Sequence, residues 1–175
     1  MTDRWRHREY EQLIVPHLDA AYNLARWMVK NDADAEDLVQ DACVRALKFL
    51  ETFRGVNARS WLLSIVRNTC YSWLRQKSSG ERQYVEFNEE VHGRPEDSPD
   101  PATLTEQQLN WEMLKKALEE IPDEFREVLI LRELEECSYK EIAEITGVPL
   151  GTVMSRLARA RTHLHRKLLD CTKGE

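Results

Sequence analysis

The feature that most restricts the fold is the run of residues 138–161, which has the pattern of two short helices joined by a glycine turn. Ser138 is placed to cap the first helix, and Glu141 can reach back to the same turn. Gly147 then ends that helix, because glycine most easily adopts the left-handed conformation found at helix ends. Pro149 keeps the residue before it extended, so a second helix begins just after it. The pattern predicts a helix-turn-helix.

The second of these helices, from Gly151 to Leu168, has one basic and one apolar face and carries no acidic residue. Such a helix by itself could simply be amphipathic and solvated, but the capped helix and turn before it favour a recognition helix. A recognition helix enters the DNA major groove by its N-terminal end. The residues placed to contact base edges and phosphates are therefore Thr152, Ser155, Arg156 and Arg159.

The charge of the chain is strongly segregated along the sequence. The net charge of −6 over 175 residues argues at first against binding to nucleic acid. However, every charged residue between Thr52 and Gly80 is basic, whereas the stretch from Glu81 to Glu106 is mainly acidic. Two basic segments therefore flank an acidic connector, which favours two modules over one.

Several classes of protein are not supported by the sequence. No apolar run approaches the roughly 18 to 20 residues that span a bilayer, and no signal-peptide core is present, so we expect a cytoplasmic protein. The four cysteines include no Cys-x-x-Cys pair, which favours reduced thiols. There is no Walker loop, nucleophile triad or His-Glu-x-x-His helix. We therefore expect no catalysis, metal or cofactor.

Helical periodicity covers most of the remaining chain, so the predicted fold class is all-α, with two small helical domains joined by a flexible acidic linker. The linker is predicted because residues 78–103 lose the periodicity and are rich in proline and acidic side chains. In the second predicted helix, one apolar stripe is expected to pack inward: Leu38, Ala42, Ala46 and Phe49. Helices are expected at about 10–30, 32–49, 60–76, 104–120 and 123–134, and the domain boundaries at 8–78, 79–103 and 104–171.

Three motifs, in this order, resemble one known family. The first is Asp-Ala-Glu-Asp-Leu-Val-Gln-Asp at 34–41, and the second is Phe-Arg-Gly at 53–55 followed by Trp-Leu-Leu-Ser-Ile-Val-Arg-Asn at 61–68. The third is the segment 121–132 before the predicted helix-turn-helix. Together they resemble the extracytoplasmic-function (ECF) sigma factors of bacterial RNA polymerase, in the sigma-70 family. The resemblance implies a region 2-like domain, a region 4-like domain, and binding to core RNA polymerase and promoter DNA.

The resemblance also implies roles for individual residues. In the family, the helix that matches Asp37, Gln40 and Asp41 binds core polymerase, and their spacing places these three residues on one helix face. The predicted recognition helix would contact the promoter minus-35 element. The loop and helix that follow residue 55 would bind unpaired minus-10 DNA. The residues implied in that contact are Asn57, Arg59, Ser60, Arg67, Asn68, Tyr71 and Arg75.

The resulting hypothesis is a sigma factor that directs promoter-specific initiation and aids promoter melting. An anti-sigma factor is implied as a partner by the resemblance alone. The main alternative is a dimeric regulator that binds duplex DNA through the helix-turn-helix only, but it leaves the acidic face at 37–41 and the minus-10-like loop unexplained. Met154 and Ala158 depart from the family pattern in the recognition helix, so the promoter sequence is not inferred.

Overall fold

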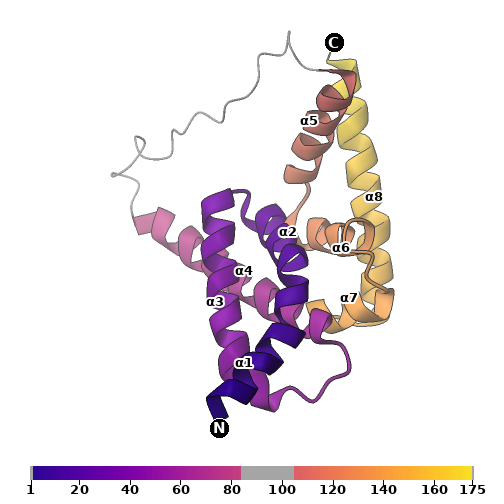
Figure 1. Cartoon of the computed structure of the whole chain (residues 1–175). Coiled ribbons are helices and arrows are strands. Elements are labelled where there is room, and N and C mark those ends of the chain that lie inside the picture. Colours follow the sequence, from indigo (N-terminus) through magenta and orange to yellow (C-terminus); the bar gives the residue numbers. More distant parts are fainter. Residues whose placement is uncertain (1, 84–104, 175) are drawn as a thin grey trace.

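Every regular element is a helix in the computed structural model, which describes residues 2–83 and 105–174 (Figure 1). The all-α prediction is confirmed for these residues. None of the described helices has the length and apolar content needed to cross a membrane. The first module contains α1 (Thr2–Leu13), η1 (Val15–His17), α2 (Leu18–Val29), α3 (Asp32–Phe49), η2 (Leu50–Thr52) and α4 (Ala58–Gln83). The second module contains α5 (Glu106–Glu119), α6 (Asp123–Glu133), α7 (Tyr139–Thr146) and α8 (Leu150–Lys173).

The first module differs from the prediction in several respects. The single helix expected at 10–30 is broken, because Pro16 lies in the 3-10 turn η1 between α1 and α2. Helix α4 continues seven residues past its expected end, to Gln83, and so includes the first residues of the predicted linker. The rest of that linker lies outside the described residues. Phe49 was expected inside but is 55% exposed, because the chain turns into η2 there and buries Leu50 instead.

The local signals of the second module are confirmed. Ser138 caps α7, its side chain accepting from the Glu141 backbone N–H, while the Glu141 carboxylate accepts from the Ser138 N–H. Gly147 ends that helix with φ 71°, in the left-handed region. Helix α8 buries Val153, Leu157 and Ala160 against the module. Helices α7 and α8 thus form the predicted helix-turn-helix.

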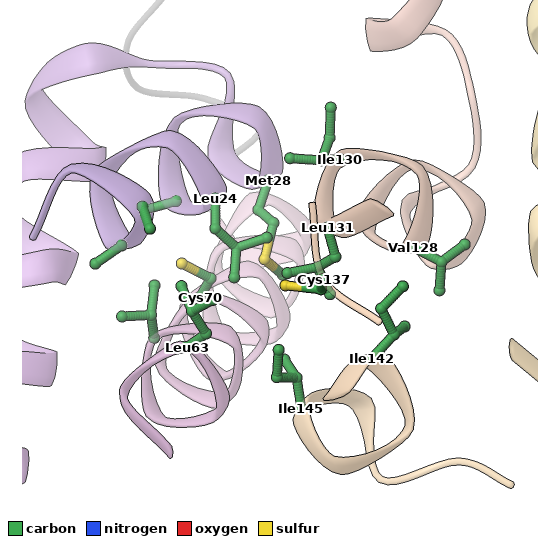
Figure 2. Close-up of a cluster of buried hydrophobic side chains, with 14 of the residues drawn as sticks. Leu24, Met28, Leu63, Cys70, Val128, Ile130, Leu131, Cys137, Ile142 and Ile145 are labelled. Carbon is green, nitrogen blue, oxygen red and sulfur yellow. The ribbon is translucent and has the colours of Figure 1, made fainter. Parts of the chain in front are cut away.

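The two modules share one hydrophobic core (Figure 2). Helix α2 packs on α6, and α4 packs on α7. Leu63 of the first module and Ile142 of the second are fully buried at this junction. Cys70 and Cys137 also lie there. The two modules are therefore closed on one another, an arrangement that the sequence does not predict.

A buried arginine fastens α6 to the C-terminal end of α2. The Arg126 side chain is almost fully buried and donates to the backbone oxygens of Trp27 at 2.9 Å and Ile121 at 2.8 Å. It also pairs with Asp123 one turn earlier in α6. Carbonyl groups at a helix C-terminus carry partial negative charge and have no partner within the helix, so a guanidinium suits this position. Arg126 therefore links the modules.

Candidate polymerase and nucleic-acid interfaces

The candidate polymerase-binding face is open to solvent. Asp37, Gln40 and Asp41 are all exposed on α3. Figure 1 shows α3 and the helix-turn-helix module at opposite sides of the molecule. Val44 follows one turn after Asp41 and is 52% exposed, so an apolar side chain extends this face. Sequence reasoning missed Val44, although its spacing from Asp41 could have identified it.

The loop before α4 forms one wall of a pocket of about 660 Å³, and α7 forms another. The rings of Phe53 and Trp61 lie 4.8 Å apart at its side. A Cβ at Gly55 would lie 3.0 Å from the Phe53 ring, so a larger residue here would require that ring to shift. Asn57 accepts a hydrogen bond from the Ser60 N–H at 3.0 Å and thereby caps α4. The pocket combines an aromatic pair with polar groups, as a site for an extruded base requires.

Two arginines among the candidate minus-10 residues on α4 are paired with carboxylates of the second module. Arg59 pairs with Glu135 at 3.1 Å and also donates to its backbone oxygen. Arg67 donates to both carboxylate oxygens of Glu127, at 2.8 and 3.1 Å, and its guanidinium lies 4.5 Å from the centre of the Tyr71 ring. Both arginines are therefore held by carboxylates of the helix-turn-helix module.

The remaining minus-10 candidates are divided between covered and open positions. Asn57 donates to the Glu141 carboxylate at 2.8 Å, and Ser60 is buried. Asn68 and Arg75, by contrast, are exposed on α4. The structure therefore brings the predicted residues together along one helix and its preceding loop, but leaves only part of that set accessible.

The environment of Glu127 explains why its carboxylate stays between arginines. Its side chain is fully buried. Burial raises the pKa of Glu127, whereas hydrogen bonds from Arg67 and the charge of Arg156 act in the opposite direction. Burial likewise raises the pKa of Tyr71, whose ring lies beside this pair. The Glu127 carboxylate lies beside two guanidinium groups, as a phosphate bound to a protein often does. Here the anion belongs to the same chain.

The candidate minus-35 face on α8 is mostly open. Ser155 and Arg159 are exposed, and Thr152 is half-buried. Arg156 lies 3.6 Å from the Glu124 carboxylate and 3.9 Å from that of Glu127. The face is therefore accessible except at Arg156.

Sequence reasoning missed the acidic partners of the paired α4 arginines and of Asn57, which lie on α6, on α7 and in the turn between them. Glu141 was identified only as a helix cap, and Glu127 and Glu135 were not identified at all. A signal for Glu127 does exist, because Arg126 and Glu127 are charged residues within the otherwise apolar run 125–131. Charged residues on the buried stripe of a helix require partners. The sequence does not say that these partners lie in the other module.

Comparisons with known proteins identify two sigma-factor regions in the chain. Residues 13–80 match Sigma-70 region 2, and residues 111–164 match Sigma-70, region 4. The chain is 31% identical over 155 residues to the ECF RNA polymerase sigma factor SigE of Mycolicibacterium smegmatis, but spans only 60% of that protein against 89% of its own length. It is 36% identical over 145 residues to the RNA polymerase sigma factor YlaC of Bacillus subtilis, covering 81% of each. Identity to the ECF RNA polymerase sigma-E factor of Escherichia coli is 34% over 141 residues, covering 77% and 74%.

Solved structures show the same fold. The sigma factor RpoE in complex with the anti-sigma factor NepR, from Bartonella quintana, superposes with a TM-score of 0.73 at 31% identity, over 92% of this chain and 97% of that one. CnrH in complex with the cytosolic domain of CnrY superposes with a TM-score of 0.66 at 25% identity, over 94% and 90%. The family expected from the motifs is confirmed. The chain therefore belongs to the ECF sigma factors of the sigma-70 family, non-enzymatic factors that direct promoter-specific transcription initiation with RNA polymerase.

Proposed function

We propose that this chain binds core polymerase through the α3 face, reads unpaired minus-10 DNA with α4 and its preceding loop, and reads the minus-35 element with α8. The observation that carries the proposal is the placement of these faces. Helix α3, with its exposed acidic residues, lies on the other side of the molecule from the helix-turn-helix module, so polymerase and DNA would use different surfaces (Figure 1). Along α4, basic groups, amides and the Tyr71 ring suit both the backbone and the bases of a single strand.

The residue roles follow from charge and exposure. The exposed carboxylates of Asp37 and Asp41, with Gln40 between them, can accept hydrogen bonds from basic groups of the polymerase. On α8, Thr152, Ser155, Arg156 and Arg159 lie in the N-terminal half, which a major groove would admit first. The domain boundaries proposed for these roles are 8–78, 79–103 and 104–171, supported by the matched ranges 13–80 and 111–164.

A protein inhibitor and a cellular location are part of the proposal. The solved relatives RpoE and CnrH are each in complex with another protein, which for RpoE is the anti-sigma factor NepR. We expect an anti-sigma factor for this chain as well. We place the protein in the cytoplasm, because core polymerase and promoter DNA are there.

Run-off transcription tests the proposal. Purified core polymerase from the source bacterium is incubated with and without the chain on a pool of that organism's upstream regions. We expect chain-dependent transcripts whose templates share two spaced upstream elements. Duplex binding by the chain alone, with no binding to core and no initiation, would support the dimeric regulator instead.

A charge reversal tests the α3 face separately. Asp41→Arg should weaken core binding at least about tenfold, because it places a cation opposite basic groups of the partner. Glu112→Arg is the matched control, since Glu112 is an exposed acid of α5, in the other module. Binding is measured by titrating labelled chain with core polymerase. Equal affinity for Asp41→Arg and Glu112→Arg would remove the assignment of this face.

A further inference from the structure

Three carboxylates of the second module occupy the candidate DNA-binding residues of the first. Glu127, Glu135 and Glu141 contact Arg67, Arg59 and Asn57, respectively, with closest side-chain distances of 2.8, 3.1 and 2.8 Å. A nucleic-acid strand would present phosphate oxygens and base acceptors to the same donors. These carboxylates therefore lie where DNA oxygens would bind. Arg67, Arg59 and Asn57 cannot contact the carboxylates and a DNA strand at the same time.

Glu127 connects the two candidate DNA faces. It binds Arg67 of α4 and lies 3.9 Å from Arg156 of α8. The side chains of Glu127 and Glu135 are 0% and 7% exposed, so salt screens these pairs less than surface pairs. The Glu127 carboxylate thus interacts with one arginine of each candidate DNA face while the modules are closed.

The apolar junction explains how the closed state is held without a partner. Leu24, Met28 and Leu63 of the first module meet Leu131 and Ile142 of the second in a shared core (Figure 2). Burial of apolar surface supplies the attraction, while the ion pairs fix the register, because buried pairs gain little net free energy after desolvation. Interfaces of this kind within a chain open more easily than a domain core.

The candidate polymerase face is not part of this junction. Asp37, Gln40 and Asp41 remain exposed while Arg59 and Arg67 are covered. Polymerase can thus reach the closed chain before DNA can reach α4.

We propose that the free chain is self-masked: with no other protein bound, the carboxylates of Glu127, Glu135 and Glu141 occupy Arg67, Arg59 and Asn57, and the modules must separate before these three residues can bind DNA. The inference rests on the proposed function in assigning α4 to DNA. It goes further in making the chain its own inhibitor. Masking reduces the apparent DNA affinity of the free chain to the affinity of the open form multiplied by the fraction of molecules that are open.

The test uses the full chain and two readouts. Small-angle X-ray scattering reports whether the modules are closed, and fluorescence anisotropy reports binding to a short fluorescein-labelled single-stranded oligonucleotide of random sequence. Glu127→Gln removes the counter-charge of Arg67 and so disfavours the closed state, while leaving every candidate DNA residue in place. Glu133→Gln is the matched control, because it removes the same charge from an exposed pair with Arg161 within the second module.

We expect wild type to scatter as the closed form. Glu127→Gln should populate extended molecules and bind the oligonucleotide about threefold to tenfold more tightly, with Glu133→Gln close to wild type. Glu135→Gln should act in the same direction. Wild type that is already extended in solution would overturn the proposal, even if Glu127→Gln fails to fold. Unchanged scattering and affinity in folded Glu127→Gln and Glu135→Gln would overturn it as well.

Run-off transcription with the same proteins separates the two proposals. If wild type supports initiation but shows no masking, the proposed sigma function stands and only the self-inhibition is rejected. If wild type is closed and never supports initiation with core polymerase, the proposed sigma function is rejected instead.

Discussion

The DNA-reading faces of the two modules differ in accessibility although both are basic. On α8, Ser155 and Arg159 point to solvent, whereas on α4 Arg59 and Arg67 are held by carboxylates of the other module. The difference follows from what surrounds each face. The α4 face adjoins Leu63 and Cys70, which need an apolar cover, while α8 buries its apolar stripe within its own module. Apolar residues beside a binding face can therefore determine whether that face is masked.

The largest effect should come from the link between the modules. Arg126→Met should lower the free energy of unfolding by about 3 to 5 kcal/mol, because several buried backbone oxygens lose their donor. Urea denaturation followed by circular dichroism measures this. Arg132→Met is the control, since Arg132 donates to the Cys137 backbone oxygen within one module. Equal losses for both variants would show that Arg126 is no special link between the modules.

A smaller effect should distinguish the open face. Arg159→Ala should weaken duplex binding by the free chain by about 1 kcal/mol, since an exposed cation of α8 can reach phosphates without any opening. Electrophoretic mobility shifts at low salt measure this, with Arg159→Lys expected to retain most of the affinity. If Arg159→Ala binds as wild type does, α8 is not the open DNA face of the free chain.

The smallest effect concerns the covered face at high pH. Burial raises the pKa of Tyr71 above its ordinary value of 10.0, so the closed state favours the neutral phenol. The resulting stabilisation is fully present below pH 10 and is lost as pH rises toward the pKa of the closed state. Thermal melting between pH 8 and 11 should show a decline that Tyr71→Phe reduces. A decline of the same size in Tyr71→Phe would mean that Tyr71 does not titrate in this way.

The distance between interacting residues separates what the sequence predicts from what it does not. The Ser138 cap and the Gly147 helix end each depend on residues within one turn, so the helix-turn-helix was predicted with its main details. The masking contacts join positions 60, 76 and 84 residues apart, and no periodicity reports such pairs. Phe49 was predicted inside because a helical stripe does not reveal where the helix ends and the chain turns into η2. The individual polymerase and promoter contacts remain predictions.

The shared core also gives the chain an internal chemical reporter. Cys70 and Cys137 come from different modules, and burial raises their thiol pKa values to about 12 and about 11. The thiolate is the form that attacks an alkylating agent, so both side chains should be unreactive while the core is intact. Cys43 and Cys171 are only half-buried and should be modified first. The rate at which Cys70 and Cys137 become alkylated, read by mass spectrometry, would therefore measure how often an unlabelled, native chain opens.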